Sequence, residues 1–459
     1  MRIAHVIHAF PPLSRAGSEN YCYSLAAEEA RRHQVSVFHR VADPSWPEYE
    51  VTEDRVGALP VVRINRTFRD MQSFEDTYRS APVAAAFAAF LDRVRPDVVH
   101  FHHVTCLSTT CVHEAKARGI SIVYTLHDFW LLCPRGQLLR RDLSLCKTHT
   151  EADCVRCMAY QLRLSGGQAQ MRALSEWAAW LKQFRLPKEL YGRLVSRPFR
   201  DETAAVAQIR ERTAHMLEMC GLVDRFVAPS RFLRDRYVDA GVPANKITVH
   251  DYGFDTRPWS KRPLAELTGG PLRVVYLGTW IPSKGVDVLV DAVRGMQPHE
   301  AELDVYGYAV PYDGVEDYEG QLRRLAAAAP HIRFPGAYTS DEVPRMLAAA
   351  DVVVVPSIWY ENSPLTIHEA FLAGVPVIAS DHGGMAELVG NEVNGLTFRA
   401  GDARSLRHTL QRLIDEPQLL QRLRRNIPPV KSIEQNAAEL QGIYGPAIEG
   451  AGADERTGI

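Results

Sequence analysis

The chain has 459 residues, of which 46% are hydrophobic and 24% are charged, a composition typical of a soluble globular protein. Its 53 basic and 55 acidic side chains nearly balance, which disfavours a protein that binds nucleic acid mainly by neutralising phosphates. The longest apolar run, Ala81–Leu91, is much shorter than a membrane span. These features predict two or three domains in a cytoplasmic protein and leave attachment to the inner face of a membrane open.

Short apolar runs rich in β-branched residues alternate with helix-like spacing along most of the chain. The runs that are predicted to be strands are Ile3–Ile7, Val35–His39, Val98–Phe101, Ile122–Leu126, Arg273–Leu277, Glu302–Tyr306, Val352–Val355 and Val375–Ala379. Alternating strands and helices predict βαβ units, and hence parallel sheets covered by helices on both faces. The fold class is therefore predicted to be α/β.

The alternation restarts near residue 273, after a turn-rich segment that contains several Pro and Gly residues. We therefore predict an N-terminal Rossmann-like domain over residues 1–257 and a C-terminal Rossmann-like domain over residues 258–430. The remaining residues, 431–459, are predicted to form a tail that packs back on the N-terminal domain.

A segment at about residues 133–222 interrupts the alternation and is predicted to be an insertion, first Cys-rich and then helical. Within it, Leu174–Arg185 places apolar and aromatic side chains on one helical face, with basic residues beside and after them. Three interpretations stay open. The helix packs on the first domain, lies at a membrane that holds a lipid-linked acceptor, or forms an oligomer contact.

Four of the eight cysteines lie in one short window, at Cys133, Cys146, Cys154 and Cys157. The last two have the short spacing of chelating pairs in structural zinc sites, and the first two would complete a tetrahedral thiolate set. Structural zinc, disulfides and free thiols are the alternatives. A zinc ion here would pin an acceptor-side loop that contains Arg135 and would take no part in catalysis.

The segment over residues 351–372 carries the strongest functional pattern. A buried strand, Val352–Val355, is followed by a loop, then by Ser363, a good N-cap, and by Pro364, which suits the first position of a helix. The backbone N–H groups near Leu365 and Thr366 would then point out of the helix N-terminus. Such a terminus, after the carboxyl end of a parallel strand, is where a phosphate or pyrophosphate binds.

Two carboxylates flank this predicted anion site, Glu361 in the loop and Glu369 about one turn inside the helix. A carboxylate beside a phosphate would repel it, so each is expected to face hydroxyl groups instead. A carboxylate can accept two hydroxyl hydrogen bonds, which fits the diol of a ribose or the hydroxyls of a sugar.

The sequence from Glu361 to Glu369 resembles the E-x7-E signature of the retaining GT-B glycosyltransferases of family four. Further segments resemble other loops of that family, in order along the chain: Pro11–Glu19, Val227–Phe232, Tyr252–Asp255, Leu277–Leu289 and Ser380–Leu388. The resemblance implies the GT-B fold, in which two Rossmann-like domains face each other across a cleft. It also implies sugar transfer from a nucleotide-diphosphate donor with retention at the anomeric carbon.

The resemblance also assigns roles to single residues. Lys284 matches a lysine that contacts the donor diphosphate, Glu369 an acid that binds the ribose, and Glu361 an acid that touches the transferred sugar. Gly17 would let the backbone approach the diphosphate closely. The donor-binding residues are thus expected to be Gly17, Gly278, Thr279, Lys284, Ser363, Pro364, Leu365, Thr366 and Glu369.

His127 matches an active-site histidine of the family that hydrogen-bonds the donor sugar. Together with Glu361 and Lys284 it forms the expected catalytic set. Asp128 is expected either to orient His127 or to meet the acceptor, and Arg135 is a further acceptor candidate.

No D-x-D motif stands where it would bind a metal, so no catalytic metal is expected and Lys284 must help to stabilise the leaving diphosphate. Thr279 stands where the family often has an arginine, so Lys284 is expected to stabilise more of the negative charge of the diphosphate. The implied partners are a nucleotide-sugar donor, with UDP favoured over GDP, and a glycan, lipid-linked or small-molecule acceptor, as in polysaccharide or glycoconjugate synthesis; nucleic acid is not among them. The alternatives are a non-catalytic nucleotide-sugar-binding subunit and a GT-B epimerase or hydrolase.

Overall fold

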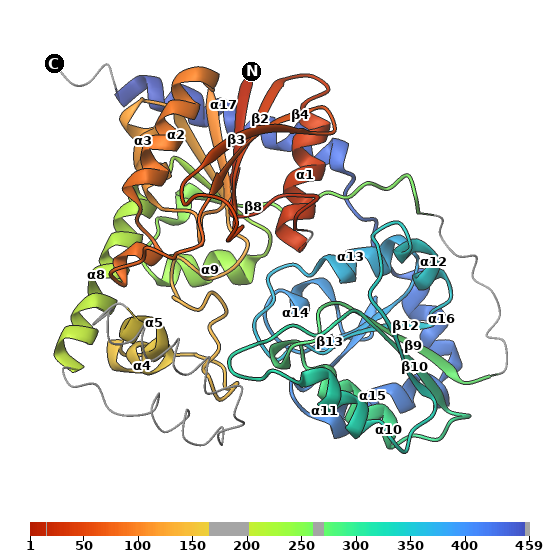
Figure 1. Cartoon of the computed structure of the whole chain (residues 1–459). Coiled ribbons are helices and arrows are strands. Elements are labelled where there is room, and N and C mark those ends of the chain that lie inside the picture. The colour runs from red at the N-terminus through yellow and green to blue at the C-terminus, as the bar shows by residue number, and fades with distance from the viewer. Residues whose placement is uncertain (15, 165–201, 260–269, 455–459) are drawn as a thin grey trace.

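Two β-sheets, built almost entirely of parallel strands, form the two lobes of this computed structural model (Figure 1). The structure describes residues 1–14, 16–164, 202–259 and 270–454. The first sheet has the order β3-β4-β2-β1-β5-β6-β7-β8, and only β3 and β4 run antiparallel. Its strands are β1 (Arg2–Ile7), β2 (Gln34–Val41), β3 (Val51–Val56), β4 (Leu59–Asn65), β5 (Val98–His103), β6 (Ser121–Thr125), β7 (Arg225–Ala228) and β8 (Ile247–Val249).

Burial follows the position of each strand in this sheet. Every residue of the central strands β5 and β6 is buried, because helices cover both faces of a parallel sheet. The outermost strand, β3, carries Glu53, Asp54 and Arg55, and its side chains are mostly exposed. Charged side chains on an edge strand protect it from pairing with another chain.

The helices of the N-terminal lobe pack on this sheet and on one another. They are α1 (Gly17–Glu29), α2 (Ala81–Val94), α3 (Thr110–Ala117), α4 (Glu151–Cys157), α5 (Ala159–Leu164), α8 (Glu202–Leu222) and α9 (Arg231–Asp239), with two 3-10 turns, η1 (Glu75–Thr77) and η2 (Ala244–Lys246). The predicted amphipathic helix over Leu174–Arg185 lies outside the described residues. Within the described ranges, no helix has the length and apolar character needed to cross a bilayer.

The second sheet is entirely parallel, in the order β11-β10-β9-β12-β13-β14. Its strands are β9 (Leu272–Leu277), β10 (Ala301–Tyr306), β11 (Ile332–Gly336), β12 (Val352–Val355), β13 (Val377–Ser380) and β14 (Gly395–Phe398). Its helices are α10 (Val286–Arg294), α11 (Tyr318–Leu325), α12 (Val343–Ala348), α13 (Leu365–Leu372), α14 (Met385–Leu388), α15 (Ala403–Asp415) and α16 (Pro417–Arg425), with the 3-10 turn η3 (Pro282–Lys284).

This second strand order is the 3-2-1-4-5-6 order of Rossmann folds, and the first sheet follows the same plan with β3 and β8 added at its two edges. The predicted α/β architecture of two Rossmann-like lobes is therefore confirmed. In such sheets, ligands bind beyond the carboxyl ends of the strands where the strand order reverses. That point lies between β1 and β5 in the first lobe and between β9 and β12 in the second.

The last helix, α17 (Ile433–Asp454), returns to the N-terminal lobe and packs against β6 and α1 (Figure 1). Asn436 ties it down, because its Oδ1 accepts from the Tyr21 hydroxyl at 2.9 Å and its Nδ2 donates to the Asp251 carbonyl at 2.8 Å. Farther along the helix, the Tyr444 hydroxyl donates to Glu29 Oε1 at 2.9 Å. Helix α17 is thus held on the N-terminal lobe by hydrogen bonds and by packing on β6 and α1.

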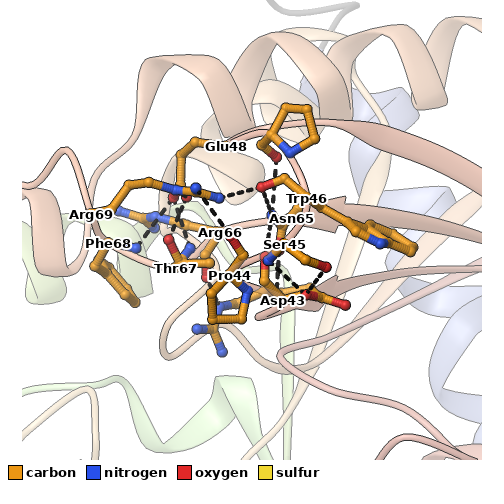
Figure 2. Close-up of polar contacts among 12 residues, drawn as sticks. Asp43, Pro44, Ser45, Trp46, Glu48, Asn65, Arg66, Thr67, Phe68 and Arg69 are labelled. Atoms are coloured by element: carbon orange, nitrogen blue, oxygen red, sulfur yellow. Dashed lines mark hydrogen bonds and ion pairs between the residues drawn. The ribbon is translucent and has the colours of Figure 1, made fainter.

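Polar contacts also stiffen the loops that follow β2 and β4 (Figure 2). Asn65 donates through Nδ2 to three backbone carbonyls of the loop after β2. Glu48 accepts from the Thr67 backbone N–H at 2.7 Å and from Arg69 Nε at 2.9 Å. These loops lie at the carboxyl edge of the sheet and give that edge a fixed shape.

Candidate functional site

The candidate site lies where loops from the switch points of the two sheets meet. Asn362, after β12, donates through Nδ2 to the backbone carbonyl of His127, after β6, at 2.6 Å and so joins the lobes. Beside this contact, Gly17 begins α1 and Leu365 begins α13. A Cβ added to Gly17 would lie only 3.4 Å from Leu365 Cδ1. Two helix N-termini, one from each lobe, therefore meet at the site.

Neither of these N-termini is capped by a side chain. Ala16 occupies the N-cap position of α1 and Pro364 that of α13, and neither makes a side-chain cap. Thr366 follows Leu365 in the first turn of α13. Because the first N–H groups of a helix have no partner within it, both ends can donate to an anion such as a diphosphate.

Ser363 does not cap α13, so the prediction that it does is wrong. Its hydroxyl donates to Asp251 Oδ1 at 2.6 Å and lies 2.8 Å from His368 Nε2. Pro364 keeps an extended backbone, with φ −61° and ψ 124°, so the helix begins one residue later, at Leu365. The Ser363 hydroxyl therefore does not accept from a backbone N–H of the first turn and instead contacts Asp251 in the linker between the lobes.

Glu361 and Lys284 are in direct contact, with Lys284 Nζ 2.6 Å from Glu361 Oε1. The same oxygen accepts from Ser357 Oγ at 2.7 Å and from Trp359 Nε1 at 2.9 Å. Glu361 is only 6% exposed. Among the described residues, its other oxygen, Oε2, has no hydrogen-bond partner. The carboxylate is thus held by one oxygen and can accept a ligand hydroxyl with the other.

Glu369 lies on α13, one turn after Leu365, and its carboxyl group has no hydrogen-bond partner among the described residues. Burial raises the pKa of Glu369 to about 7. The ionised carboxylate therefore lacks the compensation that hydroxyl donors would supply. A ribose diol is a ligand that would supply it.

Gly278 and Thr279 follow β9, at the switch point of the second sheet. Gly278 has φ 149°, a conformation that favours glycine, and the Thr279 carbonyl accepts from the Tyr276 hydroxyl at 2.9 Å. The turn η3 comes next and delivers Lys284 to Glu361.

A buried chain of hydrogen bonds runs from Glu29 through three histidines, the last of them His127, to Tyr252. Glu29 Oε2 is 2.7 Å from His5 Nε2, and His5 Nδ1 is 2.9 Å from His102 Nε2. His102 Nδ1 is 3.2 Å from His127 Nε2, and His127 Nδ1 is 2.7 Å from the Tyr252 hydroxyl. His127 is thus held through both ring nitrogens, and the contact with His102 is the longer of the two.

The proton positions in this chain follow from charge and connectivity. Burial lowers the pKa of His102 and of His127, so both rings are neutral at pH 7 and each carries one N–H. If Glu29 accepts as a carboxylate and His5 carries a single N–H, His5 donates to Glu29 from Nε2, and the same tautomer follows for the next two rings. The Tyr252 hydroxyl then donates to His127 Nδ1. Sequence reasoning missed these partners because single buried histidines on strands, and a tyrosine in the segment after β8, carry no motif of their own.

Asp128 does not contact His127, so the predicted orienting role is wrong. Its Oδ2 lies 2.9 Å from His103 Nε2, and its Oδ1 accepts from the Trp130 backbone N–H at 2.7 Å. The His8 ring lies 5.0 Å from that of His103. These groups form a second polar cluster beside His127, which keeps Asp128 as an acceptor candidate.

Arg135 is engaged in a contact between the lobes. Its Nη2 lies 3.0 Å from Asp313 Oδ2, and its Nε donates to the Leu139 carbonyl at 3.1 Å. Arg141 binds the other oxygen of Asp313 at 2.8 Å. The ion pairs tie the Cys-rich loop to the loop after β10, so the predicted acceptor contact of Arg135 would need this pair to open.

Two family models match the chain. The model described as glycosyl transferases group 1 matches residues 260–428, and the model described as glycosyltransferase family 4 matches residues 15–160. Together they cover more than half of the chain. Among curated proteins, the amylovoran biosynthesis glycosyltransferase AmsK of Erwinia amylovora is 28% identical over 40% of this chain and 46% of its own length.

A GDP-mannose-dependent phosphatidylinositol monomannoside mannosyltransferase of Mycobacterium tuberculosis is 32% identical over 39% of this chain. The match spans 48% of that protein, so both curated matches cover less than half of the relative. Among solved structures, sucrose-phosphate synthase from Thermosynechococcus elongatus aligns with a TM-score of 0.66 and 18% identity over 98% of this chain and 99% of that one. Anabaena HepE in complex with UDP and glucose aligns with a TM-score of 0.61 and 17% identity over 97% and 100%. These likenesses confirm the GT-B fold.

Proposed function

We propose, from the premise that this chain belongs to the glycosyltransferases of family four, that it moves a sugar from a nucleotide-diphosphate donor to an acceptor hydroxyl with retention at the anomeric carbon. The proposed acceptor is a glycan, a lipid-linked sugar or a small molecule. One observation carries the proposal. Two uncapped helix N-termini meet beside the Lys284–Glu361 pair and the His127 loop.

In the proposed reaction, the diphosphate lies between the N-termini of α1 and α13. Their N–H groups and the Lys284 ammonium stabilise the charge that grows as the sugar departs. An ammonium has three donors, so Lys284 can keep its bond to Glu361 while it contacts a phosphate oxygen. Glu361 Oε2 then accepts from a hydroxyl of the transferred sugar.

Retention follows if the acceptor approaches the same face of the sugar that the diphosphate leaves. The bond from the anomeric carbon to the phosphate oxygen breaks, the bond to the acceptor oxygen forms, and the departing phosphate oxygen takes the acceptor proton. Closure of the two lobes would exclude water, which competes as an acceptor. The contacts between Asn362 and His127 and between Arg135 and Asp313 support a closed arrangement of this kind.

The donor base is proposed to be uracil, with guanine as the second candidate, because similar proteins are described with both. We place the reaction in the cytoplasm, and at the membrane surface if the acceptor is lipid-linked.

Thermal unfolding with UDP-, GDP- and ADP-sugars tests the donor. One class is expected to raise the Tm, because a ligand that binds only the native state stabilises it. The protein should then hydrolyse that donor slowly, and Glu361→Gln should abolish the hydrolysis in a folded protein, because its amide oxygen can still accept from Ser357 and Trp359. Donor binding with no turnover that depends on Glu361 would identify a binding subunit instead.

Donor affinity should also depend on pH through Glu369. Because the pKa of this carboxyl is raised to about 7, it is largely protonated at pH 6, and the form that accepts two ribose hydroxyl bonds appears as the pH rises. The Kd for a UDP-sugar should fall by up to about tenfold between pH 6 and pH 8. Titration calorimetry would show this slope in the wild type and its loss in Glu369→Gln. An equal slope in both proteins would contradict the role of Glu369.

A further inference from the structure

The Cys-rich loop and α4 close around one small pocket in the N-terminal lobe. Cys133 lies in the loop after β6, and the backbone N–H of Cys146 donates to the Leu138 carbonyl at 2.8 Å across a tight hairpin. Cys154 and Cys157 lie one turn apart on α4. All four line a pocket of about 20 Å³, which has room for about one water-sized sphere. We call these four residues the cysteine cluster.

The cluster belongs to a part of the chain that has little regular structure of its own. Its four thiols are free and half-buried. The start of α4 is fixed by a capping box, in which the Thr150 side chain accepts from the Asp153 backbone and the Asp153 side chain accepts from the Thr150 backbone. The capping box thus fixes the start of the helix that carries both Cys154 and Cys157. Cys133 and Cys146 lie outside this helix, so only contacts of the thiols would join them to this pair.

A buried guanidinium beside the cluster lacks a partner of opposite charge. Arg212, on α8, is 2% exposed, and its Nη2 donates to the Trp130 carbonyl at 2.6 Å. Its Nη1 is buried without a hydrogen-bond partner, and no carboxylate pairs with it in the described part of the chain. The thiols of Cys133 and Cys154 lie within electrostatic range of it. Buried charges are normally paired, because burying a lone ion is costly.

We propose that the cysteine cluster binds one structural Zn²⁺ ion. Binding would deprotonate the four thiols, release the protons to solvent and leave a zinc–tetrathiolate with two net negative charges. Arg212 would then face an anion from the buried side. Arg135 and Arg140, which line the same pocket, would add positive charge beside it. The site thus explains both the convergence of four thiols and a buried arginine without a carboxylate.

Closing the site requires the four sulfurs to move closer together than they lie in this structure. Zinc–sulfur bonds of about 2.3 Å place tetrahedral sulfurs about 3.8 Å apart, and no three sulfurs of the cluster lie within 4.8 Å of one another. Among the described residues, the one metal-ligand group that meets that limit is His5, His100 and His102. Every ring nitrogen of that group already has a hydrogen-bond partner, so it is a hydrogen-bond network and does not compete as a metal site.

The ion would also fix the loop that bridges the lobes. Arg135 and Arg141 lie between Cys133 and Cys146 in the sequence, and both bind Asp313 of the second lobe. The Tyr312 hydroxyl contacts Gln137 in the same loop. A zinc ion would therefore hold these side chains in place for the contact between the lobes.

Metal analysis of the full-length protein tests this proposal. After purification without an affinity metal, elemental analysis should find about one zinc per chain, and a mercurial that blocks thiols should release it to a colorimetric chelator. Refolding with Co²⁺ should produce the charge-transfer and d–d absorption of tetrahedral cobalt thiolate. Substoichiometric zinc after purification from zinc-supplemented cells, or disulfides within the cluster found by mass spectrometry, would overturn the proposal.

Variants assign the ligands. The double variant Cys154→Ser/Cys157→Ser should lose at least about nine-tenths of the zinc. The matched control Cys106→Ser, at a half-buried cysteine outside the cluster, should keep it. Full zinc in the double variant would refute the assignment to these cysteines. If the double variant does not fold, the cobalt spectrum of the wild type decides, because an oxygen- or nitrogen-ligated cobalt lacks the intense thiolate bands.

Discussion

Replacing Lys284 by methionine is expected to lower the rate of sugar transfer by about 10²- to 10³-fold. Methionine keeps much of the side-chain volume and removes the ammonium that lies 2.6 Å from Glu361. The lost charge matters most in the transition state, when negative charge grows on the leaving diphosphate, so kcat should fall more than the donor Kd rises. Initial rates of nucleotide release, with the donor found by thermal unfolding, measure this.

The fold should survive this change, because Ser357 and Trp359 still donate to Glu361. A matched control is Lys116→Met, which removes an ion pair with Asp224 near the opposite, amino-terminal edge of the sheet. The control should transfer sugar at the rate of the wild type. A Lys284→Met protein that is folded and transfers within about threefold of the wild type would remove Lys284 from the proposed mechanism.

Replacing His127 by alanine is expected to reduce kcat/KM by about 10²-fold or more. In the assigned tautomers, His127 carries its proton on Nε2, and the 3.2 Å contact with His102 is its weaker bond. That proton can be redirected to an oxygen of the donor sugar, while the Tyr252 hydroxyl continues to hold Nδ1. Steady-state kinetics on the folded variant measure the loss.

Tyr252→Phe separates positioning from direct contact. Without its hydroxyl, the His127 ring can adopt either tautomer, so transfer should fall by roughly tenfold and His127→Ala/Tyr252→Phe should be no worse than His127→Ala alone. The control His113→Ala removes a half-buried histidine on α3 and should leave transfer unchanged. Additive losses in the double variant would mean that Tyr252 acts independently of His127.

The local features of the site were predictable because they depend on near neighbours in the chain. The strand Val352–Val355, the turn at Pro364 and the helix that carries Glu369 follow from short-range pattern and backbone preference. The strand prediction missed β3, β4, β7, β8, β11 and β14. Each of them is short, lies at or near an edge of its sheet, or has polar or Pro residues within its sequence, so it lacks the long apolar run on which the prediction depended.

The predictions of side-chain contacts were wrong where the side chain binds a partner that is distant in the sequence. Ser363 has the composition of an N-cap, yet its hydroxyl is used by Asp251, which lies 112 residues earlier. Asp128 follows His127 directly, yet its carboxylate turns to His103. Neither choice can be read from neighbouring residues, since a hydroxyl or carboxylate binds whichever partner the fold brings closest.

The sequence by itself therefore determined the α/β class, the two-lobe plan and the approximate start of the helix that carries Glu369, because hydrophobic period and helix-start chemistry act over a few residues. Tertiary structure alone decided which groups touch. Parallel strands bring their carboxyl ends to one edge, so His5, His102 and His127 meet although they lie far apart in sequence. The contact between the N-termini of α1 and α13 likewise exists only because two separately folded sheets face each other.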